Sequence, residues 1–401
     1  MRIALPVHSF EPGGGERVAL RLAAEWQAAG HEVTVVLGRD RGVCASTAPD
    51  LDYRTSREPF ATDRWETLWM MICLARFLRR ERVDALFCPG NTYTVVCVVM
   101  RLLFPRRCPA VLVKISNDLE RPDLPPFARP LYRLWLRVQG RLLDRFVALA
   151  EPMKPEIVET MRVSAASVAV IPDPALLRIE WQRLGAIDEG DAPAGRGTRY
   201  LSVGRLVAQK NYALLLRAFA ASRSPDDRLV IAGEGSLLRR LVSLRDDLGL
   251  TNLVEFPGHV SDVEALYRDA DVFVLSSDYE GIPAVAIEAL AAGLPIATTR
   301  SSAGMDWLTG YGRFGEVVPQ RNPDALGDAM RRMASIFPDR QAMREQAQAF
   351  TLERASGAYL DEFETMQSAS NGRRAEFLSP DGAGLFSTRR LATKPSMREC
   401  E

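Results

Sequence analysis

The sequence predicts an α/β protein built from two doubly wound domains in tandem, with a ligand cleft where the carboxyl ends of their sheets face each other. The chain has 401 residues, which at roughly 100–200 residues per domain is enough for two domains with separate cores. Short apolar runs alternate with amphipathic segments of helical period along most of the chain, which is typical of parallel sheets covered by helices. An aperiodic stretch at residues 184–198, rich in Gly, Ala and Asp, interrupts this alternation and indicates a linker.

The first series of elements starts at the N-terminus. A strand over residues 2–7, a Gly-rich turn and an amphipathic helix over 17–29 lead into a strand over 32–37, which completes one βαβ unit. Further alternation predicts helices at 64–80, 92–103 and 130–143 and strands at 85–88, 110–115 and 145–149. Pro172 and Pro174 close this first domain, which we place at residues 1–175 and follow with a linker at 176–198.

The second series occupies residues 199–349. Apolar runs predict strands at 200–203, 228–232, 254–257, 272–275 and 295–298, and helical periodicity predicts helices at 212–222, 237–248, 263–269, 283–292, 322–336 and 340–367. Residues 350–369 form the last part of this helical pattern, with apolar side chains three or four positions apart. These side chains are Leu352, Ala355, Tyr359, Phe363 and Met366. Residues 370–401 lack a sustained apolar period, and we expect a disordered tail there.

The composition is that of an ordinary globular protein, with 47% hydrophobic and 25% charged residues. Its 51 basic side chains equal its 51 acidic ones, which argues against a dedicated nucleic-acid-binding protein. Six scattered cysteines indicate free thiols in a reducing compartment. The N-terminus lacks a signal-peptide pattern, and the most apolar stretch is shorter than the roughly 20 residues that cross a bilayer. We therefore expect a cytoplasmic protein.

A Gly-Gly-Gly turn separates the first strand from the first helix. Gly14 and Gly15 in this turn have no side chain and would let a phosphate approach the helix N-terminus, although a tight turn without a ligand explains them as well. The dinucleotide fingerprint needs a glycine where this chain has Val18, which disfavours an NAD or FAD site.

Two cations flank the end of the second domain's first strand. Gly204 and Arg205 end the strand, and Lys210 precedes the next helix. Taken singly, each cation is readily explained as a solvated surface charge. Together at the carboxyl end of a strand, they indicate a site for a diphosphate, which needs charge neutralisation and fork-like donors.

Two carboxylates follow another strand of this domain. Glu280 lies in the loop after the strand and Glu288 on the next helix, and neither has a cation partner beside it in sequence. Carboxylates in a cleft accept hydrogen bonds from the vicinal hydroxyls of a sugar or a ribose. The alternative is that both are helix-start carboxylates favoured by the helix dipole.

The pattern resembles the retaining nucleotide-sugar glycosyltransferases known as group 1, or family 4, which have two Rossmann-like domains in the GT-B fold. The resemblance covers residues 1 to about 367 and is strongest between residues 200 and 330. It is carried by the segments GGGERVALRLAAEWQAAGHEVTVV, VGRLVAQKNYALLLRAFA, LVIAGEGSLLRRL, VEFPGHVSDVEALYRDADVFVLSSDYEGIPAVAIEALAAGLPIATT and FGEVVPQRNPDALGDAM.

The resemblance implies roles for these residues around a nucleotide-sugar co-substrate, with no metal and no other cofactor. Arg205 and Lys210 would hold the donor diphosphate and stabilise the leaving group, and Glu288 would bind the ribose. The donor sugar would lie on Glu280 and on the segment after it. The remaining implied donor-binding residues are Gly14, Gly15, Gly204, Phe256, Gly258, Gly281, Ile282 and Pro283. The first domain would face the acceptor, and the helix at 350–369 would cross back to that domain.

One position departs from the family pattern. Many relatives have a histidine in the loop after the strand that here reads VLVKISND, where it contacts the donor sugar. This chain has Lys114, Ser116, Asn117 and Asp118 in that segment and no histidine. Asn117 and Asp118 can both supply a polar contact there, and we assign the donor contact to Asn117.

The resemblance implies a metal-independent hexosyltransferase that moves a sugar with retention from a nucleoside-diphosphate sugar to a hydroxyl. We favour a UDP-sugar because it is the commonest donor in the family, and a glycan or lipid-linked acceptor in surface polysaccharide or lipopolysaccharide synthesis. Two alternatives stay open. A nucleotide-sugar epimerase of the same fold would need further acid/base groups than the three histidines provide. A non-catalytic glycan-binding relative would not need all four charged donor-site residues.

A stripe of arginines marks the predicted helix at 130–143. These are Arg129, Arg133, Arg137, Arg141 and Arg145, four residues apart and interspersed with leucines. Basic amphipathic helices bind anionic membranes, which predicts a peripheral position on the inner face of the membrane. The alternative is a solvated helix face over a packed core.

Overall fold

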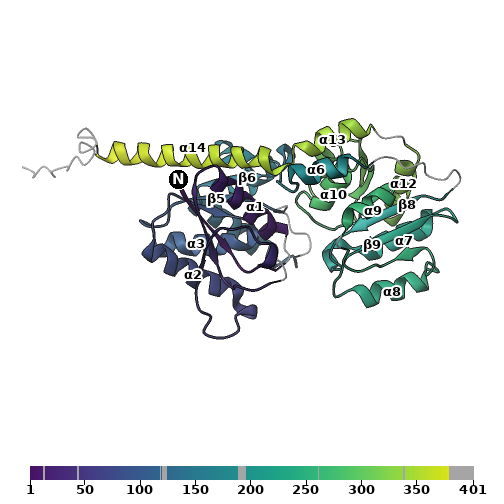
Figure 1. Ribbon diagram of the computed structural model, residues 1–401, viewed down its shortest axis with the longest axis horizontal. Coiled ribbons are helices and arrows are strands. Elements are labelled where there is room, and N and C mark those ends of the chain that lie inside the picture. The colour runs from purple at the N-terminus through teal and green to yellow at the C-terminus, as the bar shows by residue number, and fades with distance from the viewer. Residues whose placement is uncertain are drawn as a thin grey trace, which may run out of the picture.

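The computed structural model describes residues 1–11, 14–42, 45–117, 119, 124–187, 196–260, 262–336 and 339–378, with side chains up to residue 368. Two α/β domains lie side by side along its long axis, and the long helix α14 runs back along the first domain (Figure 1). The predicted two-domain α/β architecture is confirmed.

The first domain contains a seven-stranded parallel sheet in the order β3-β2-β1-β4-β5-β6-β7. Its strands are β1 (Arg2–Val7), β2 (Glu32–Leu37), β3 (Asp52–Thr55), β4 (Ala85–Cys88), β5 (Ala110–Lys114), β6 (Arg145–Ala148) and β7 (Val168–Val170). The helices of this part of the chain are α1 (Gly14–Ala28), α2 (Glu66–Arg80), α3 (Thr94–Leu103), α4 (Ala128–Leu142) and α5 (Lys154–Met161).

The second domain contains a six-stranded parallel sheet in the order β10-β9-β8-β11-β12-β13. Its strands are β8 (Arg199–Val203), β9 (Arg228–Ala232), β10 (Val254–Glu255), β11 (Val272–Leu275), β12 (Ile296–Thr299) and β13 (Gly315–Val318). The remaining helices are α6 (Arg178–Gly185), α7 (Tyr212–Ser222), α8 (Leu238–Asp247), α9 (Val263–Asp269), α10 (Ala284–Ala291), α11 (Met305–Leu308), α12 (Pro323–Ala334), α13 (Arg340–Gln348) and α14 (Leu352–Leu378).

The chain crosses between the domains at two places, and the two crossings are hydrogen-bonded to each other. Leu176 and Thr351 form a parallel bridge. The backbone N–H of Leu352 donates to the Leu176 carbonyl at 2.8 Å, and that of Leu176 donates to the Phe350 carbonyl at 3.2 Å. Thr351 also separates α13 from α14, so the single helix predicted over 340–367 is two helices.

Helix α6 lies within the stretch that we expected to be linker. It packs against α10 and α13 of the second domain. The indole N–H of Trp181 donates to the Arg344 carbonyl at 2.9 Å. The crossing point is therefore at residues 175–177, before α6, and residues 188–195 of the expected linker lie outside the described residues.

Helix α14 packs on the first domain. All five residues of its apolar stripe are buried in the same core as Trp26 and Phe87. The Trp26 ring contacts those of Tyr359 and Phe363 edge to face, with centroids 6.0 and 5.2 Å away. Arg145 of β6 forms an ion pair with Glu362. The helix continues to Leu378, into the expected tail, and residues 379–401 lie outside the described part of the chain.

Among the described residues, no helix is both long and apolar enough to span a bilayer. Cys73, Cys88, Cys97 and Cys108 are buried free thiols.

Candidate functional site

The carboxyl ends of the two sheets meet at the domain interface. Gly281, in the loop after β11, lies so close to Ser116, after β5, that a Cβ atom at Gly281 would be 2.1 Å from the Ser116 carbonyl oxygen. On α1, the Arg17 guanidinium is 3.9 Å from a carboxylate oxygen of Glu288 on α10. Only glycine therefore fits at position 281 in this arrangement, and the predicted site residues of the second domain face the first domain.

Lys210 is held in place by the segment between β8 and α7. Asn211 has a left-handed backbone (φ 45°) and caps α7 by accepting a hydrogen bond from the Leu214 N–H at 3.3 Å. Its amide donates to Asp278 Oδ1 at 2.9 Å. The Ser276 hydroxyl donates to the Lys210 carbonyl at 2.8 Å. These contacts fix Lys210 against the loop that carries Glu280.

Lys210 and Glu280 form an ion pair at the centre of the candidate site. Lys210 Nζ is 2.6 Å from Glu280 Oε1, with the side chains 14% and 10% exposed. Glu280 has no cation beside it in the sequence, and the fold brings Lys210 to it from 70 residues away. Any anion that binds the Lys210 ammonium must therefore compete with Glu280 for it.

Arg205 and Gly204 lie at the end of β8. Arg205 is exposed, and its guanidinium makes no ion pair or hydrogen bond within the described ranges. A Cβ atom at Gly204 would be 2.9 Å from the Tyr212 hydroxyl oxygen, which accounts for the glycine. The structure thus places one exposed cation and one paired cation after the same strand.

The loop that carries Glu280 is anchored from several sides. The Gln209 amide donates to the Tyr279 carbonyl at 2.8 Å, and the Glu280 N–H donates to the Ser301 carbonyl at 2.9 Å. The Ser302 hydroxyl donates to the Gly281 carbonyl at 2.7 Å. Ile282 and Pro283 are buried, and Pro283 is the N-cap of α10. The loop is therefore a rigid support for the Glu280 carboxylate.

Glu288 lies on α10 at the interface with α1. The Tyr267 hydroxyl donates to Glu288 Oε2 at 2.9 Å. Burial raises the pKa of Glu288, while the Tyr267 hydrogen bond and the Arg17 charge oppose this shift. Glu280 and Glu288 thus both lie at the domain interface with separate hydrogen-bond partners.

The other predicted donor-site residues lie around these groups. Gly14 begins α1, and a Cβ atom at Gly15 would have nothing within 4 Å. Asn117 is half-buried, and Asp118 lies outside the described residues. After β10, Phe256 packs against the second-domain core and Gly258 (φ 76°) accepts a hydrogen bond from the Gly233 N–H at 2.8 Å.

Lys114 pairs with Asp173 and with none of these residues among those described. Its ammonium donates to Asp173 Oδ1 at 2.5 Å, and the two side chains are 3% and 13% exposed. Many relatives have a histidine in the loop after β5. In this chain the described polar residues of that loop are Ser116 and Asn117.

A group of three residues at the carboxyl edge of the first sheet was missed from the sequence. His8, after β1, stacks on Tyr93 with ring centroids 4.4 Å apart. The Tyr93 hydroxyl donates to Glu16 Oε1 at 3.0 Å and accepts from the His8 backbone N–H at 3.1 Å. Burial lowers the pKa of His8 to about 4, with Glu16 opposing and Arg39 adding to the shift. Tyr93 lies 85 residues after His8 and 77 after Glu16, so no local sequence pattern indicates this group.

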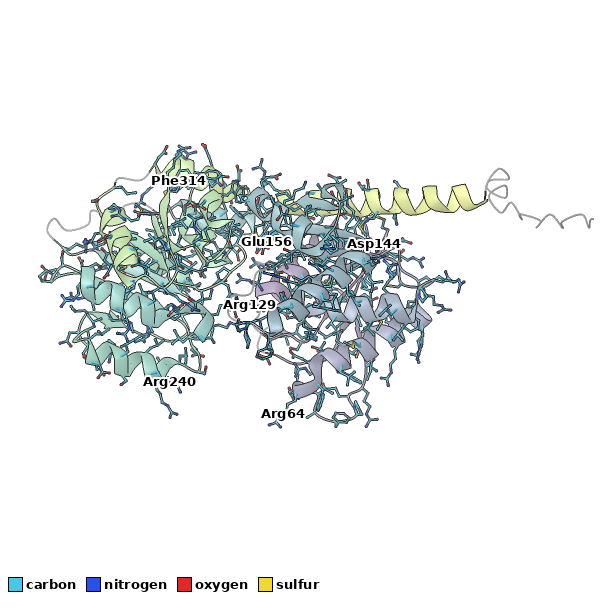
Figure 2. The ribbon with its side chains drawn as sticks, turned by 180° about the vertical axis from the view of Figure 1, so that it is seen from behind. Arg64, Arg129, Asp144, Glu156, Arg240 and Phe314 are labelled. Carbon is cyan, nitrogen blue, oxygen red and sulfur yellow. The ribbon has the colours of Figure 1, made fainter. Side chains whose placement is uncertain are left out.

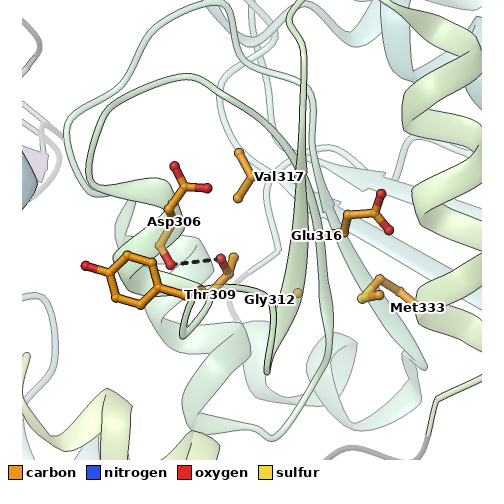
Figure 3. A pocket seen from close by; sticks show the side chains of 8 residues that line it. Asp306, Thr309, Gly312, Glu316, Val317 and Met333 are labelled. Atoms are coloured by element: carbon orange, nitrogen blue, oxygen red, sulfur yellow. Dashed lines mark hydrogen bonds between the residues drawn. The ribbon is translucent and has the colours of Figure 1, made fainter.

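A hollow of about 290 Å³ lies at the outer edge of the second domain (Figure 3). Its lining includes Asp306 and Thr309 of the α11 region and Gly315 and Glu316 of the edge strand β13. Asp306 is paired with Arg300, and Glu316 with Arg332 at 2.5 Å. Because Gly315 begins β13, the hollow reaches the amino end of the strand, opposite the edge that carries Lys210 and Glu280.

Comparison with known families gives one match on each domain. Residues 12–174 match the family described as Glycosyltransferase Family 4, and residues 189–350 match Glycosyl transferases group 1. Together the two matches cover most of the chain.

Several curated proteins are similar to this chain. Mannosylfructose-phosphate synthase of Agrobacterium fabrum is 36% identical over 146 residues, 33% of this chain and 32% of its own length. A Campylobacter jejuni N-acetylgalactosaminyltransferase that acts on N-acetylgalactosamine-N,N'-diacetylbacillosaminyl-diphospho-undecaprenol is 33% identical over 37% of this chain and 40% of its own length. The chain thus spans about a third of the length of the first curated relatives. A GDP-mannose-dependent phosphatidylinositol dimannoside mannosyltransferase of Mycobacterium tuberculosis is 27% identical over 90% of this chain and 95% of its own.

Solved structures share the fold at low sequence identity. A lipopolysaccharide outer core galactosyltransferase superposes with a TM-score of 0.70 at 16% identity, covering 91% of this chain and 99% of its own. The Anabaena protein HepE in complex with UDP-glucose superposes with a TM-score of 0.68 at 17% identity, covering 91% and 100%. This similarity extends across both domains.

Proposed function

The chain belongs to the group 1 glycosyltransferases and has their GT-B fold, and from this premise we propose that it transfers a sugar from a nucleoside-diphosphate sugar to an acceptor hydroxyl. The observation that carries the proposal is the Lys210–Glu280 pair at the domain interface, with Arg205 after the same strand and Glu288 on the neighbouring helix. Retention of configuration and hexosyl specificity rest on the family resemblance.

In this proposal the charged residues bind different parts of the donor. The diphosphate takes the Lys210 ammonium, and the exposed Arg205 guanidinium adds fork-like donors to the departing phosphate. Glu280, released from Lys210, accepts hydrogen bonds from the sugar hydroxyls, and Glu288 accepts them from the ribose. The two cations stabilise the charge that develops on the leaving diphosphate, which is the work that a metal ion does in other transferases.

We further propose a UDP-sugar donor and a glycan or lipid-linked acceptor in surface polysaccharide or lipopolysaccharide synthesis. HepE binds UDP and UDP-glucose in the same fold, and the name of the Campylobacter relative includes a diphospho-undecaprenol-linked sugar. Such an acceptor would place the protein in the cytoplasm, at the inner face of the membrane.

Helix α4 supports a membrane position. Phe127, Leu131 and Leu134 are 84%, 71% and 54% exposed, and arginines 129, 133, 137 and 141 on the same helix are exposed as well. Arg145 belongs to β6 and pairs with Glu362, so it is not part of this surface. Arg129 lies on the side of the first domain next to the second, and Arg64 lies at the lower edge of the first domain in this view (Figure 2). Apolar and basic side chains on one exposed helix fit an anionic lipid surface.

A panel of UDP-, GDP- and ADP-sugars tests the proposed reaction. Slow hydrolysis to free nucleotide and sugar, abolished in Lys210→Ala, supports a transferase. A changed sugar still attached to its nucleotide would identify an epimerase, and no turnover with thermal stabilisation by glycans alone would identify a binding protein. Stabilisation by one nucleotide at 100 times its Kd, worth about 2.7 kcal/mol, identifies the donor base.

A further inference from the structure

The group formed by His8, Glu16 and Tyr93 lies beside the loop that carries Glu280. Strand β4 lies between β1 and β5 in the sheet, so the residues that follow these three strands are neighbours. Asn91, two residues before Tyr93, accepts a hydrogen bond from the Ser116 N–H at 2.9 Å, and Ser116 contacts Gly281. The group therefore lies at the same edge of the first sheet as Ser116, which contacts the loop that carries Glu280.

Two polar atoms of this group are left without a protein partner. Tyr93 bonds one oxygen of the Glu16 carboxylate, and no residue of the described ranges bonds the other. The Nδ1 atom of His8 is buried without a hydrogen bond, and the side chain is 7% exposed. A buried polar atom without a partner, such as His8 Nδ1, is costly in a folded protein, and the second Glu16 oxygen is on a side chain that is only partly buried.

We propose that His8, Glu16 and Tyr93 form the acceptor subsite of the enzyme, and that its ligand is an uncharged sugar ring with free hydroxyls. Glu16 accepts a hydrogen bond from an acceptor hydroxyl, His8 forms a second bond, and Tyr93 positions the carboxylate. This inference rests on the proposed transferase function and names the chemical class of its acceptor.

The charges around the group exclude a phosphate as the reacting end of the acceptor. The Glu16 carboxylate would repel an anion, and the nearby cations already have partners. Arg39 pairs with Glu66 at 3.0 Å and with Asp63, and Arg17 faces Glu288. His8 is neutral at pH 7 because its pKa is lowered to about 4. A carboxylate and a neutral imidazole are hydroxyl-binding groups.

The experiment uses the full chain with the donor identified in the panel. Donor hydrolysis without acceptor is measured separately from transfer to methyl glycosides of glucose, galactose, mannose and N-acetylglucosamine and to farnesyl phosphate. The variants are Glu16→Gln and Tyr93→Phe. The control is Glu32→Gln, because Glu32 is exposed at the amino end of β2, away from the interface.

We expect Glu16→Gln to raise the KM for the glycoside about 10- to 100-fold while donor hydrolysis stays within about twofold of wild type, since only the acceptor loses a charged hydrogen-bond partner. Tyr93→Phe should act in the same direction more weakly. Saturation-transfer NMR of the glycoside, on protein loaded with the nucleotide identified in the panel, should show the same loss.

Three results would overturn the inference: unchanged glycoside KM in Glu16→Gln, equal loss of hydrolysis and transfer in that variant, or transfer to farnesyl phosphate in preference to every glycoside. Wild-type protein that hydrolyses the donor and glycosylates none of the glycosides overturns it too. If wild-type protein releases nucleotide from no donor, the proposed function itself fails, and the acceptor subsite fails with it.

Discussion

Lys210 and Arg205 follow the same strand but lie in different environments. Replacing Lys210 should therefore affect both stability and turnover, whereas replacing Arg205 should affect turnover alone. Lys210 is largely buried and paired with Glu280, whereas Arg205 is exposed. Removing one partner of a buried pair leaves an uncompensated charge that costs about 3–5 kcal/mol, while an exposed substitution usually stays within about 0.5 kcal/mol.

We therefore predict that Lys210→Ala and Arg205→Ala each lower kcat by about 10²–10³, as the loss of one preorganised donor does, and that only Lys210→Ala lowers Tm. Turnover and thermal unfolding of purified variants measure the two effects. The double variant Lys210→Met/Glu280→Gln should regain Tm without regaining turnover. Near-normal turnover in both alanine variants would contradict the diphosphate assignment.

His8 makes the stability of the first domain sensitive to acid. Its pKa falls from 6.5 in the unfolded chain to about 4 in the folded one, so the unfolded state binds more protons between these values. Neutral His8 makes its full contribution to the free energy of unfolding above pH 6.5. This contribution, about 3 kcal/mol, is lost as the pH falls towards 4. Urea unfolding at pH 7.5 and 4.5 should show this loss in wild type. His8→Phe, which keeps the ring, should show a smaller loss, and an equal loss would contradict the assignment.

Sequence reasoning selected Glu280, Glu288, Arg205 and Lys210 as candidates because each lies in a motif whose context is local. It could not predict the pairing of Lys210 with Glu280, which lie 70 residues apart, or the contact of Glu16 with Tyr93, 77 residues apart. Such contacts depend on which strands become neighbours in the sheet, and strand order is not encoded in any local pattern.

The helices and strands also divide into those that the sequence predicted and those that it missed. The central strands of both sheets were predicted because they are continuous apolar runs. Strands β3, β7 and β13, three of the four edge strands, were missed, and β3 reads DYRT with two exposed charged residues. Helix α5 begins with Lys154 and Pro155, directly after a turn that contains Pro152, and this proline spacing resembles a loop. Periodicity thus finds buried elements more readily than peripheral ones.

Helix α4 carries the membrane prediction. Each exposed arginine near an anionic surface contributes about 1 kcal/mol, so Arg133→Gln, Arg137→Gln and Arg141→Gln combined should weaken binding to vesicles containing anionic lipid by about 100-fold, more at low salt. Co-sedimentation measures the binding. The matched control replaces Arg239, Arg240 and Arg268 of the second domain, which are exposed on α8 and α9. Equal binding by the α4 variant and wild type would leave α4 as a solvated surface helix.

Helix α14 carries the prediction about truncation. A chain that ends at residue 370 keeps the five buried stripe residues, Leu352 to Met366, and should keep its Tm and activity. A chain that ends at residue 349 loses Tyr359 and Phe363 from the aromatic group around Trp26 and exposes that core. Loss of a single buried aromatic costs about 3–5 kcal/mol, so the shorter chain should aggregate and lose activity. An active, soluble chain ending at 349, or an unfolded one ending at 370, would contradict this account.

At the scale of the whole molecule, two paired crossings connect the domains and one helix of the first domain carries the charges that face the second. The crossings meet at Leu176 and Thr351, which makes this bridge the natural pivot for relative motion. On α1, Arg17 and Arg21 lie one turn apart, opposite Glu288 and Glu180. Because Glu288 is also the proposed ribose contact, nucleotide binding and domain closure involve the same group of charges.

Arg21 and Glu180 provide the test of this coupling, because their bidentate pair, at 2.9 and 2.5 Å, joins the domains without including a proposed donor contact. A partly exposed pair of this kind contributes about 1 kcal/mol, so Arg21→Ala should shift the balance towards the open arrangement about fivefold. Small-angle scattering should then give a larger radius of gyration without ligand, and a smaller difference with saturating nucleotide. By linkage, the affinity for the nucleotide should fall by at most the same factor, since binding must now also close the cleft.

Arg2→Ala is the control, because Arg2 pairs with Asp84 within the first domain, at 3.9 Å. An Arg21→Ala protein with the radius and nucleotide affinity of wild type would show that this ion pair does not control closure.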